Sequence, residues 1–193
     1  QSLPLEGYSL EVTREERNHL SGTRFKVKVT RDPQPYRRFS DIRDLIRAGD
    51  LSPSVRDKSI AIFESIALEE GKIHGCSVEE VHFHEVGAVD SIVDIVGSVL
   101  GMEYLGIGTA CASSLPLGSG FVETAHGRIP LPAPATVALL KGIPIHDSGL
   151  KEELVTPTGA ALVKGLVHSF GSLPPMVIEQ VGYGVGSRNL RDR

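Results

Sequence analysis

Residues 90 to about 105 carry a helical hydrophobic pattern with two very different faces. At about 100° per residue, one broad arc holds only apolar side chains: Ile92, Val93, Ile95, Val96, Val99 and Leu100. The opposite arc holds Asp90, Asp94, Gly97 and Gly101, which we call the Asp–Gly stripe. Such a helix buries its apolar face in a core, and a stripe without lysine, arginine or glutamate suggests that something packs against it too.

The Asp–Gly stripe also has a purely structural interpretation. Asp90 could cap the helix, and Asp94 would then lie near the positive end of the helix dipole. The two glycines could admit a neighbouring strand. Both interpretations predict a helix that is buried along its apolar face.

Segments with strand and helix patterns alternate along the rest of the chain. Apolar and basic side chains alternate in residues 22–30, as in a half-exposed strand. Helix signals and strand signals then follow each other. Helices are expected from Ser40 to Gly49, from Ser52-Pro53 to His74-Gly75, from Pro134 to Gly142 and from Thr156 to about Phe170; strands at 81–83, 107–112 and 177–181, with a hairpin within 113–134. We predict a single α/β domain over residues 1–193, a mixed sheet with flanking helices.

Composition and charge exclude several classes of partner. Lys and Arg number 20 against 24 Asp and Glu, and the basic residues never run longer than Arg37-Arg38, so we expect no nucleic acid. No apolar run approaches the roughly 20 residues that cross a bilayer, and the opening residues resemble no signal peptide. We therefore expect a cytoplasmic protein with no membrane partner. The two cysteines fit no CxxC pattern, so no disulfide framework or thiolate zinc site is indicated.

Potential metal ligands are concentrated between residues 82 and 94. His82 and His84 share one face of the expected strand, because alternate side chains of a strand point the same way. Glu85 is adjacent, and Asp90 and Asp94 follow one loop later. Imidazole and carboxylate groups are ligands for zinc, nickel, manganese or iron. A half-buried strand could also carry two histidines without any metal.

Two further segments could hold a ligand. His126 and Arg128 fall in an expected turn that could present imidazole and guanidinium together. Thr156, Thr158 and Gly159 open an expected helix, whose hydroxyls and free N–H groups could bind an anion such as phosphate. Simple capping by Thr156 explains most of the same pattern.

Several long motifs resemble the nickel-pincer-cofactor nickel insertase family, LarC. They are VHFHEVGAVDSIVDIVG at 81–97, LPLGSGFVETAHGRIPLPAPATVALLKGIP at 115–144, ELVTPTGAALV at 153–163 and the closing GYGVGSRNL. The resemblance implies a cytoplasmic enzyme that inserts nickel into pyridinium-3,5-bisthiocarboxylic acid mononucleotide. The implied reaction depends on CTP with Mn or Mg, and its product serves lactate racemase.

The roles of the candidate residues in such a reaction are our own hypotheses, because the resemblance supports the motifs without assigning a role to each residue. His82, His84 and His126 are assigned to nickel; Glu85, Asp90 and Asp94 to catalysis, including acceptance of the ring proton; Thr156, Thr158, Gly159 and Arg128 to the mononucleotide. Two other functions stay open: a module that delivers a transition metal without catalysis, and a metal-dependent phosphohydrolase.

The resemblance also sets an expectation for domain organisation. Family members open with a strand and loop resembling FDCFSGxxGDM, and they continue into a C-terminal domain associated with CTP. Residues 1–193 are therefore expected to be an N-terminal domain that lacks the opening segment. The expected partners are the pincer mononucleotide precursor and the C-terminal domain of the same enzyme, and a homo-oligomer is plausible.

Overall fold

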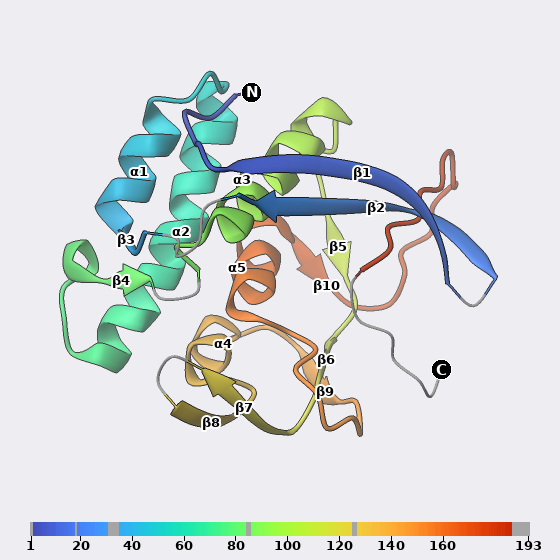
Figure 1. Cartoon of the computed structure of the whole chain (residues 1–193). Helices are drawn as coiled ribbons and strands as arrows, with labels where there is room; N and C mark the ends of the chain where they lie inside the picture. The colour runs from blue at the N-terminus through green and yellow to red at the C-terminus, as the bar shows by residue number, and fades with distance from the viewer. Residues whose placement is uncertain (1, 18, 31–34, 84–85, 125–126, 187–193) are drawn as a thin grey trace. The chain divides into compact units, whose positions relative to one another are not determined.

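The computed structural model describes residues 2–17, 19–30, 35–83, 86–124 and 127–186 (Figure 1). Contacts divide the chain into two compact units. The larger unit contains residues 1–4 and 34–174, and the smaller contains residues 5–33 and 175–193. Helices and strands occur together as predicted, so the α/β class is confirmed.

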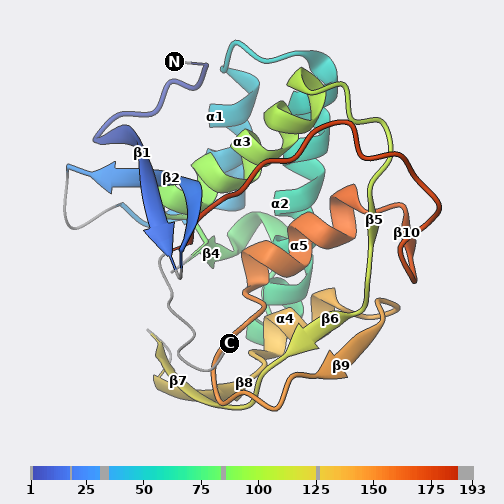
Figure 2. The same cartoon turned by 90° about the vertical axis from the view of Figure 1, so that its right-hand side faces the viewer.

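The larger unit is built around one long helix. Its helices in the described residues are α1 (Phe39–Arg47), α2 (Pro53–His74), α3 (Val89–Tyr104), α4 (Pro134–Leu139) and α5 (Pro157–Leu166). Figure 2 shows α2 among the others, and it contacts all four of them. The centre of α2 is fully buried at Ile62, Phe63 and Ile66, so this helix supplies much of the core.

Local sequence signals set the ends of α2 as expected. The Ser52 hydroxyl accepts a hydrogen bond from the Val55 N–H at 3.2 Å, and Pro53 occupies the first helical position. Gly75 ends the helix in the left-handed conformation with φ of 67°, which glycine adopts without a steric penalty. Helix α1 begins one residue before the expected Ser40, because the Asp41 carboxylate accepts a hydrogen bond from the Arg38 N–H at 2.8 Å.

The helix predicted from the Asp–Gly stripe is α3, and its apolar face is buried as predicted. Ile92 and Ile95 are fully inaccessible to solvent. Asp90 is not the N-cap, however, because Ala88 occupies that position. A methyl group at Gly97 or Gly101 would meet no atom of the larger unit's described residues within 4 Å. These glycines therefore do not admit a neighbouring strand of this unit.

The strands of the larger unit are short and pair two at a time. The antiparallel pairs are β3 (Arg37–Arg38) with β4 (His82–Phe83) and β7 (Gly120–Thr124) with β8 (Gly127–Leu131). The parallel pairs are β5 (Cys111–Ala112) with β10 (Ser169–Phe170) and β6 (Leu115–Leu117) with β9 (Ile145–Asp147). Pairing is mixed, but within the described residues each sheet of this unit has two strands, so the expected single mixed sheet is divided into separate pairs.

Two expected helices end early, and one expected strand is shorter. Helix α5 stops at Leu166, because the His168 N–H donates to the Ala110 carbonyl at 2.8 Å and the chain continues into β10. Helix α4 stops at Leu139. The strand expected at 107–112 is limited to β5. No helix in the described part of the chain has the length and apolar character needed to cross a membrane.

The smaller unit is a long hairpin of β1 (Tyr8–Arg17) and β2 (Leu20–Val29), with Tyr8 opposite Val29. Strand β2 was expected, and β1 was missed. Residues 183–185 run beside β2: the Thr23 N–H donates to the Tyr183 carbonyl at 2.8 Å, and the Val185 N–H donates to the Thr23 carbonyl at 2.9 Å. The strand expected at 177–181 does not form, and Val177 and Ile178 are exposed.

Candidate functional site

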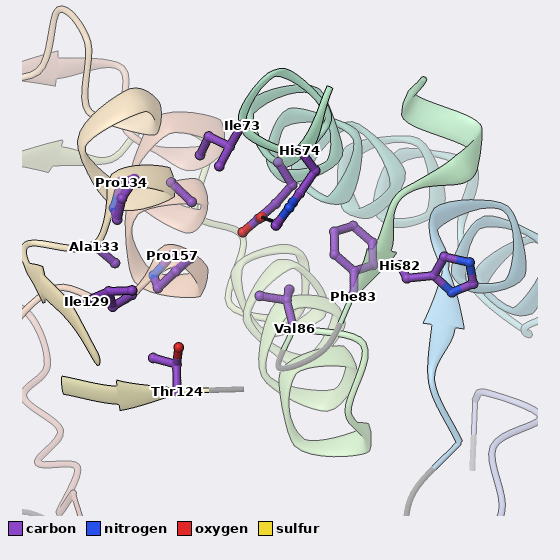
Figure 3. A pocket seen from close by; sticks show the side chains of 12 residues that line it. Ile73, His74, His82, Phe83, Val86, Thr124, Ile129, Ala133, Pro134 and Pro157 are labelled. Atoms are coloured by element: carbon purple, nitrogen blue, oxygen red, sulfur yellow. Dashed lines mark ion pairs between the residues drawn. The ribbon is translucent and has the colours of Figure 1, made fainter. Parts of the chain in front are cut away.

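A cavity of about 180 Å³ lies within the larger unit (Figure 3). It is open on one side and is lined by the end of α2, β4, the β7–β8 hairpin and the first turns of α4 and α5. The lining is mainly apolar and includes Phe83, Val86, Ile129, Ala133, Pro134 and Pro157. An apolar pocket with a small number of polar groups is the usual form of a small-molecule site, so this cavity is the candidate functional site.

Local rules explain how these elements reach the cavity. Residues three and four apart share a helix face, so Glu70, Ile73 and His74 all line it from the last turns of α2. Helices α4 and α5 each begin with a proline, Pro134 and Pro157, which fixes the backbone of the first helical turn. Both prolines therefore present rigid rings to the cavity.

Glu70 and His74 form an ion pair on the cavity wall. His74 Nε2 lies 3.2 Å from Glu70 Oε2, a contact drawn as the dashed line in Figure 3. The two side chains are 39% and 23% exposed for histidine and glutamate. Our sequence analysis missed this pair, although its i,i+4 spacing on a predicted helix was a visible signal.

His82 lines the edge of the cavity but is engaged elsewhere. Arg38 Nε donates a hydrogen bond to His82 Nε2 at 3.1 Å, so Nε2 acts as an acceptor and a neutral ring carries its proton on Nδ1. Figure 3 shows this imidazole on the far side of Phe83 from Ile129 and Pro157. A metal bound through Nε2 would have to displace Arg38.

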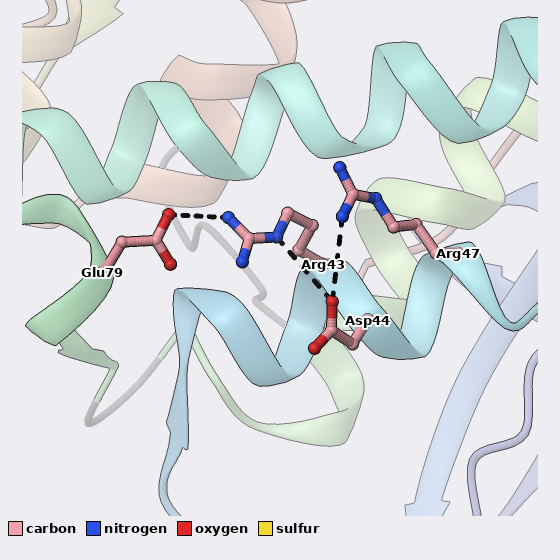
Figure 4. Close-up of polar contacts among 4 residues, drawn as sticks. All are labelled: Arg43, Asp44, Arg47 and Glu79. Carbon is pink, nitrogen blue, oxygen red and sulfur yellow. Dashed lines mark hydrogen bonds and ion pairs between the residues drawn. The ribbon is translucent and has the colours of Figure 1, made fainter.

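Two arginines form long-range contacts with the segments that precede and follow β4. Before the strand, Arg43 Nη1 lies 2.6 Å from Glu79 Oε1, linking α1 to the short 3-10 turn Val78–Glu80 (Figure 4). Asp44 lies beside both Arg43 and Arg47 in the same group. After the strand, Arg37 Nη1 donates to the Gly87 carbonyl at 2.9 Å. These two contacts hold Glu79 and Gly87, on either side of β4, against α1 and β3.

Three predicted site residues lie outside the described residues: His84 and His126, predicted to bind nickel, and Glu85, predicted to be catalytic. Their described neighbours Phe83, Val86 and Thr124 line the cavity. Among the described residues, no group of three or more His, Cys, Asp or Glu could hold a metal ion. The assignment of these residues to nickel and catalysis stays a prediction.

Asp90 and Asp94 do not line the cavity; they lie on the exposed face of α3. Asp90 Oδ1 accepts a hydrogen bond from the Ser91 N–H at 2.9 Å. Although Asp94 is exposed, neighbouring protein atoms displace part of the water around its carboxyl, and this desolvation, followed by repulsion from Asp90, raises its pKa above the usual value. The structure therefore brings the two aspartates close to each other and not to the cavity.

The raised pKa of Asp94 predicts how stability depends on pH. The folded protein holds this proton more tightly than the unfolded chain, so ionised Asp94 destabilises the fold once the pH exceeds the ordinary aspartate pKa of about 4. The destabilisation grows up to the raised pKa and persists above it. We expect Asp94→Asn to raise the urea midpoint of unfolding at pH 7 and to have little effect near pH 3.5. An equal change at both pH values would contradict this origin.

The residues predicted to bind the mononucleotide are divided between two places. The Thr156 hydroxyl accepts a hydrogen bond from the Gly159 N–H at 3.1 Å, so Thr156 caps α5 and already uses one N–H of that helix start. Thr158 is half-buried in the same turn. The Arg128 guanidinium lies 4.4 Å from the centre of the Phe121 ring on the β7–β8 hairpin. Pro157 is the member of the capping segment that reaches the cavity.

Comparisons with known proteins agree over the whole chain. The model of a family described as nickel insertion protein matches residues 1–193. A relative from Syntrophobacter fumaroxidans is 48% identical over 192 residues, covering 100% of this chain and 49% of the relative. Relatives from Geotalea daltonii and Citrifermentans bemidjiense are 51% and 50% identical, covering 98% and 97% of this chain and 48% and 49% of their own.

All three relatives are named for nickel insertion. The chain spans about half the length of these relatives. No solved structure matches it.

Proposed function

Because the chain belongs to the nickel insertion protein family, we propose that it binds the organic substrate of a nickel insertase. The substrate we propose is pyridinium-3,5-bisthiocarboxylic acid mononucleotide, into which nickel is inserted to give a pincer complex. Nickel enters as the second substrate and becomes bonded to a ring carbon and two sulfur atoms. The cavity of the larger unit is the observation that supports this assignment.

The volume of the cavity suits one aromatic ring. An apolar protein cavity of about 150 Å³ can hold benzene. At about 180 Å³, this cavity has room for a six-membered ring and little more. The ring of the precursor would therefore occupy the cavity, and its two thiocarboxylate arms, ribose and phosphate would extend through the open side. Phe83, Pro134 and Pro157 supply flat apolar surfaces for such a ring.

The polar groups on the wall also suit a pyridinium ring. The carboxylate of Glu70 and the imidazole of His74 interrupt the apolar lining from one side, at the end of α2. A cationic ring is attracted by a carboxylate, and the attraction is stronger where water is excluded. The carboxylate would therefore favour an orientation with the positive ring nitrogen toward Glu70 and the two negative thiocarboxylate arms away from it.

We assign nickel delivery to His82, His84 and His126; His82 lines the edge of the cavity, and nickel bound at its Nε2 would take the place of Arg38. Imidazole is a suitable ligand for nickel. Thr156, Thr158 and Gly159 remain our candidates for the mononucleotide phosphate, with Arg128 as an additional cation. We assign CTP, with Mn or Mg, to the part of the relatives that this chain does not span.

The test is calorimetric binding of the unmetallated precursor to the chain, with one variant that fills the cavity. Ala135 lines the cavity from α4 and is 6% exposed, so Ala135→Leu places extra carbon atoms inside it. We expect Ala135→Leu to bind the precursor at least tenfold more weakly than the wild type does, a loss of about 1.4 kcal/mol in binding free energy. Val137→Leu is the matched control, because Val137 lies on the same helix and is 51% exposed.

Circular dichroism and urea unfolding must show that both variants fold. Equal affinity in wild type and Ala135→Leu would remove the cavity as the ring site. Nickel binding without precursor binding in the wild type would instead favour a metal delivery module. Hydrolysis of simple phosphate esters by the chain would favour the phosphohydrolase.

A further inference from the structure

An acid–base pair faces the proposed ring site. Three ionisable side chains are found among the described residues that line the cavity: Glu70, His74 and His82. His82 is bonded to Arg38 and lies beyond Phe83. Glu70 and His74 are bonded to each other, 3.2 Å apart, at the wall formed by α2. We infer that Glu70 and His74 form the base that removes the ring proton during nickel insertion.

This inference rests on the proposed function, because the chemistry of that reaction requires a base. A ring C–H bond is replaced by a nickel–carbon bond, and the electron pair of the C–H bond becomes the bonding pair to nickel. Nickel stays divalent, so no oxidant or reductant is consumed. One proton is released for each ring metallated, and it must be transferred to a base.

The apolar lining determines where that proton can go. Water is a weak base, and the side chains that surround a ring in the cavity are mainly apolar. An imidazole is the side chain that most often serves as a general base. The ring proton is transferred to the imidazole of His74, and the imidazolium that forms is stabilised by the Glu70 carboxylate.

The same arrangement explains why the acceptor is a pair and not a single residue. A lone imidazolium would be repelled by the incoming nickel ion. The adjacent carboxylate compensates one positive charge, and it also orients the imidazole through its contact with Nε2. Glu70 therefore acts through His74, whereas His74 contacts the ring.

This inference moves the proton acceptor away from Asp90 and Asp94. Those carboxylates were the candidates in the sequence, but neither lines the cavity.

The test uses this chain together with the part of its relatives that it does not span, and supplies precursor, nickel, CTP and Mn. His74→Ala is expected to slow metallation at least 100-fold, within the range typical of general bases, while precursor affinity changes less than about threefold. Glu70→Gln is expected to slow the reaction about tenfold, since it retains the hydrogen-bond acceptor but loses the charge. Lys72→Gln is the matched control, because Lys72 belongs to a neighbouring ion pair on α2, with Glu69 at 2.8 Å, that does not line the cavity.

Two readouts separate a base from a structural residue. Added imidazole should restore part of the rate to His74→Ala, because the freed space admits a substitute base. Deuterium at the reacting ring carbon should slow His74→Ala more than the wild type, as proton removal becomes limiting. An unchanged rate in His74→Ala, or a loss of rate matched by an equal loss of precursor affinity, would overturn the inference. Failure of the wild type to bind precursor would overturn the proposed function itself.

Discussion

Replacing Phe63 by alanine is expected to lower the free energy of unfolding by about 3–5 kcal/mol. Phe63 is fully buried at the centre of α2, the helix that contacts the other four. Its ring lies 6.3 Å from that of Phe83, with the two planes inclined at 55°, a tilted contact that adds to the area buried. Loss of the ring leaves a cavity that the surrounding helices can close only in part.

Urea unfolding at neutral pH measures this change. The control is Leu68→Ala on the same helix, because Leu68 is 43% exposed and its truncation should cost less than about 1 kcal/mol. If Phe63→Ala cost no more than Leu68→Ala, the packing of α2 would differ from that described here. The same variant should also weaken precursor binding, since Phe83 is both the partner of Phe63 and part of the cavity wall.

Helices could be predicted where the sequence carries both an apolar period and terminal signals. The ends of α2 follow from Ser52, Pro53 and Gly75, and α3 follows from an apolar arc that persists for four turns. These signals act within a few residues, so the sequence contains them directly. The early end of α5 is different, since it depends on Ala110, which is 58 residues from His168.

Strand pairing could not be predicted in the same way. Strands β3 and β4 are two residues long and join segments 44 residues apart, as Arg38 and His82 illustrate. Such short strands have no measurable period in the sequence. The long strand β1 does have a two-residue period, because Leu10 and Val12 alternate with charged and polar residues. Recognising this alternation would have identified the hairpin of β1 with β2.

The candidate site shows the same division between local and distant information. The HFHE motif is conspicuous as a sequence, yet its described histidine is bonded to Arg38. The cavity is assembled from α2, β4, the β7–β8 hairpin and two helix starts, which only the fold brings together. Glu70 and His74 were accessible to sequence reasoning as an i,i+4 pair, but only the cavity distinguishes this pair from an ordinary pair on a helix surface.

Gly118→Ala is expected to lower the free energy of unfolding by about 3 kcal/mol, the scale for overpacking and loss of buried backbone hydrogen bonds. A methyl group at Gly118 would collide with the backbone carbonyl of Glu152, and it would lie 3.2 Å from the carbonyl of Leu150. Backbone cannot rotate away as a side chain can, so the two segments must separate. Their separation would break the hydrogen bond from the Ser119 N–H to the Leu150 carbonyl, now 2.9 Å long.

The matched control is Gly97→Ala in the interior of α3. A methyl group there meets open space in its own unit, and alanine favours a helix over glycine, so stability should rise by about 0.5–1 kcal/mol. Urea unfolding should therefore show a lower free energy of unfolding for Gly118→Ala and a higher one for Gly97→Ala. If Gly118→Ala left the free energy of unfolding unchanged, residues 117–119 and 150–152 would not approach each other closely. The β7–β8 hairpin follows directly after Gly118, so the same separation should also displace Thr124 and Ile129 from the cavity wall.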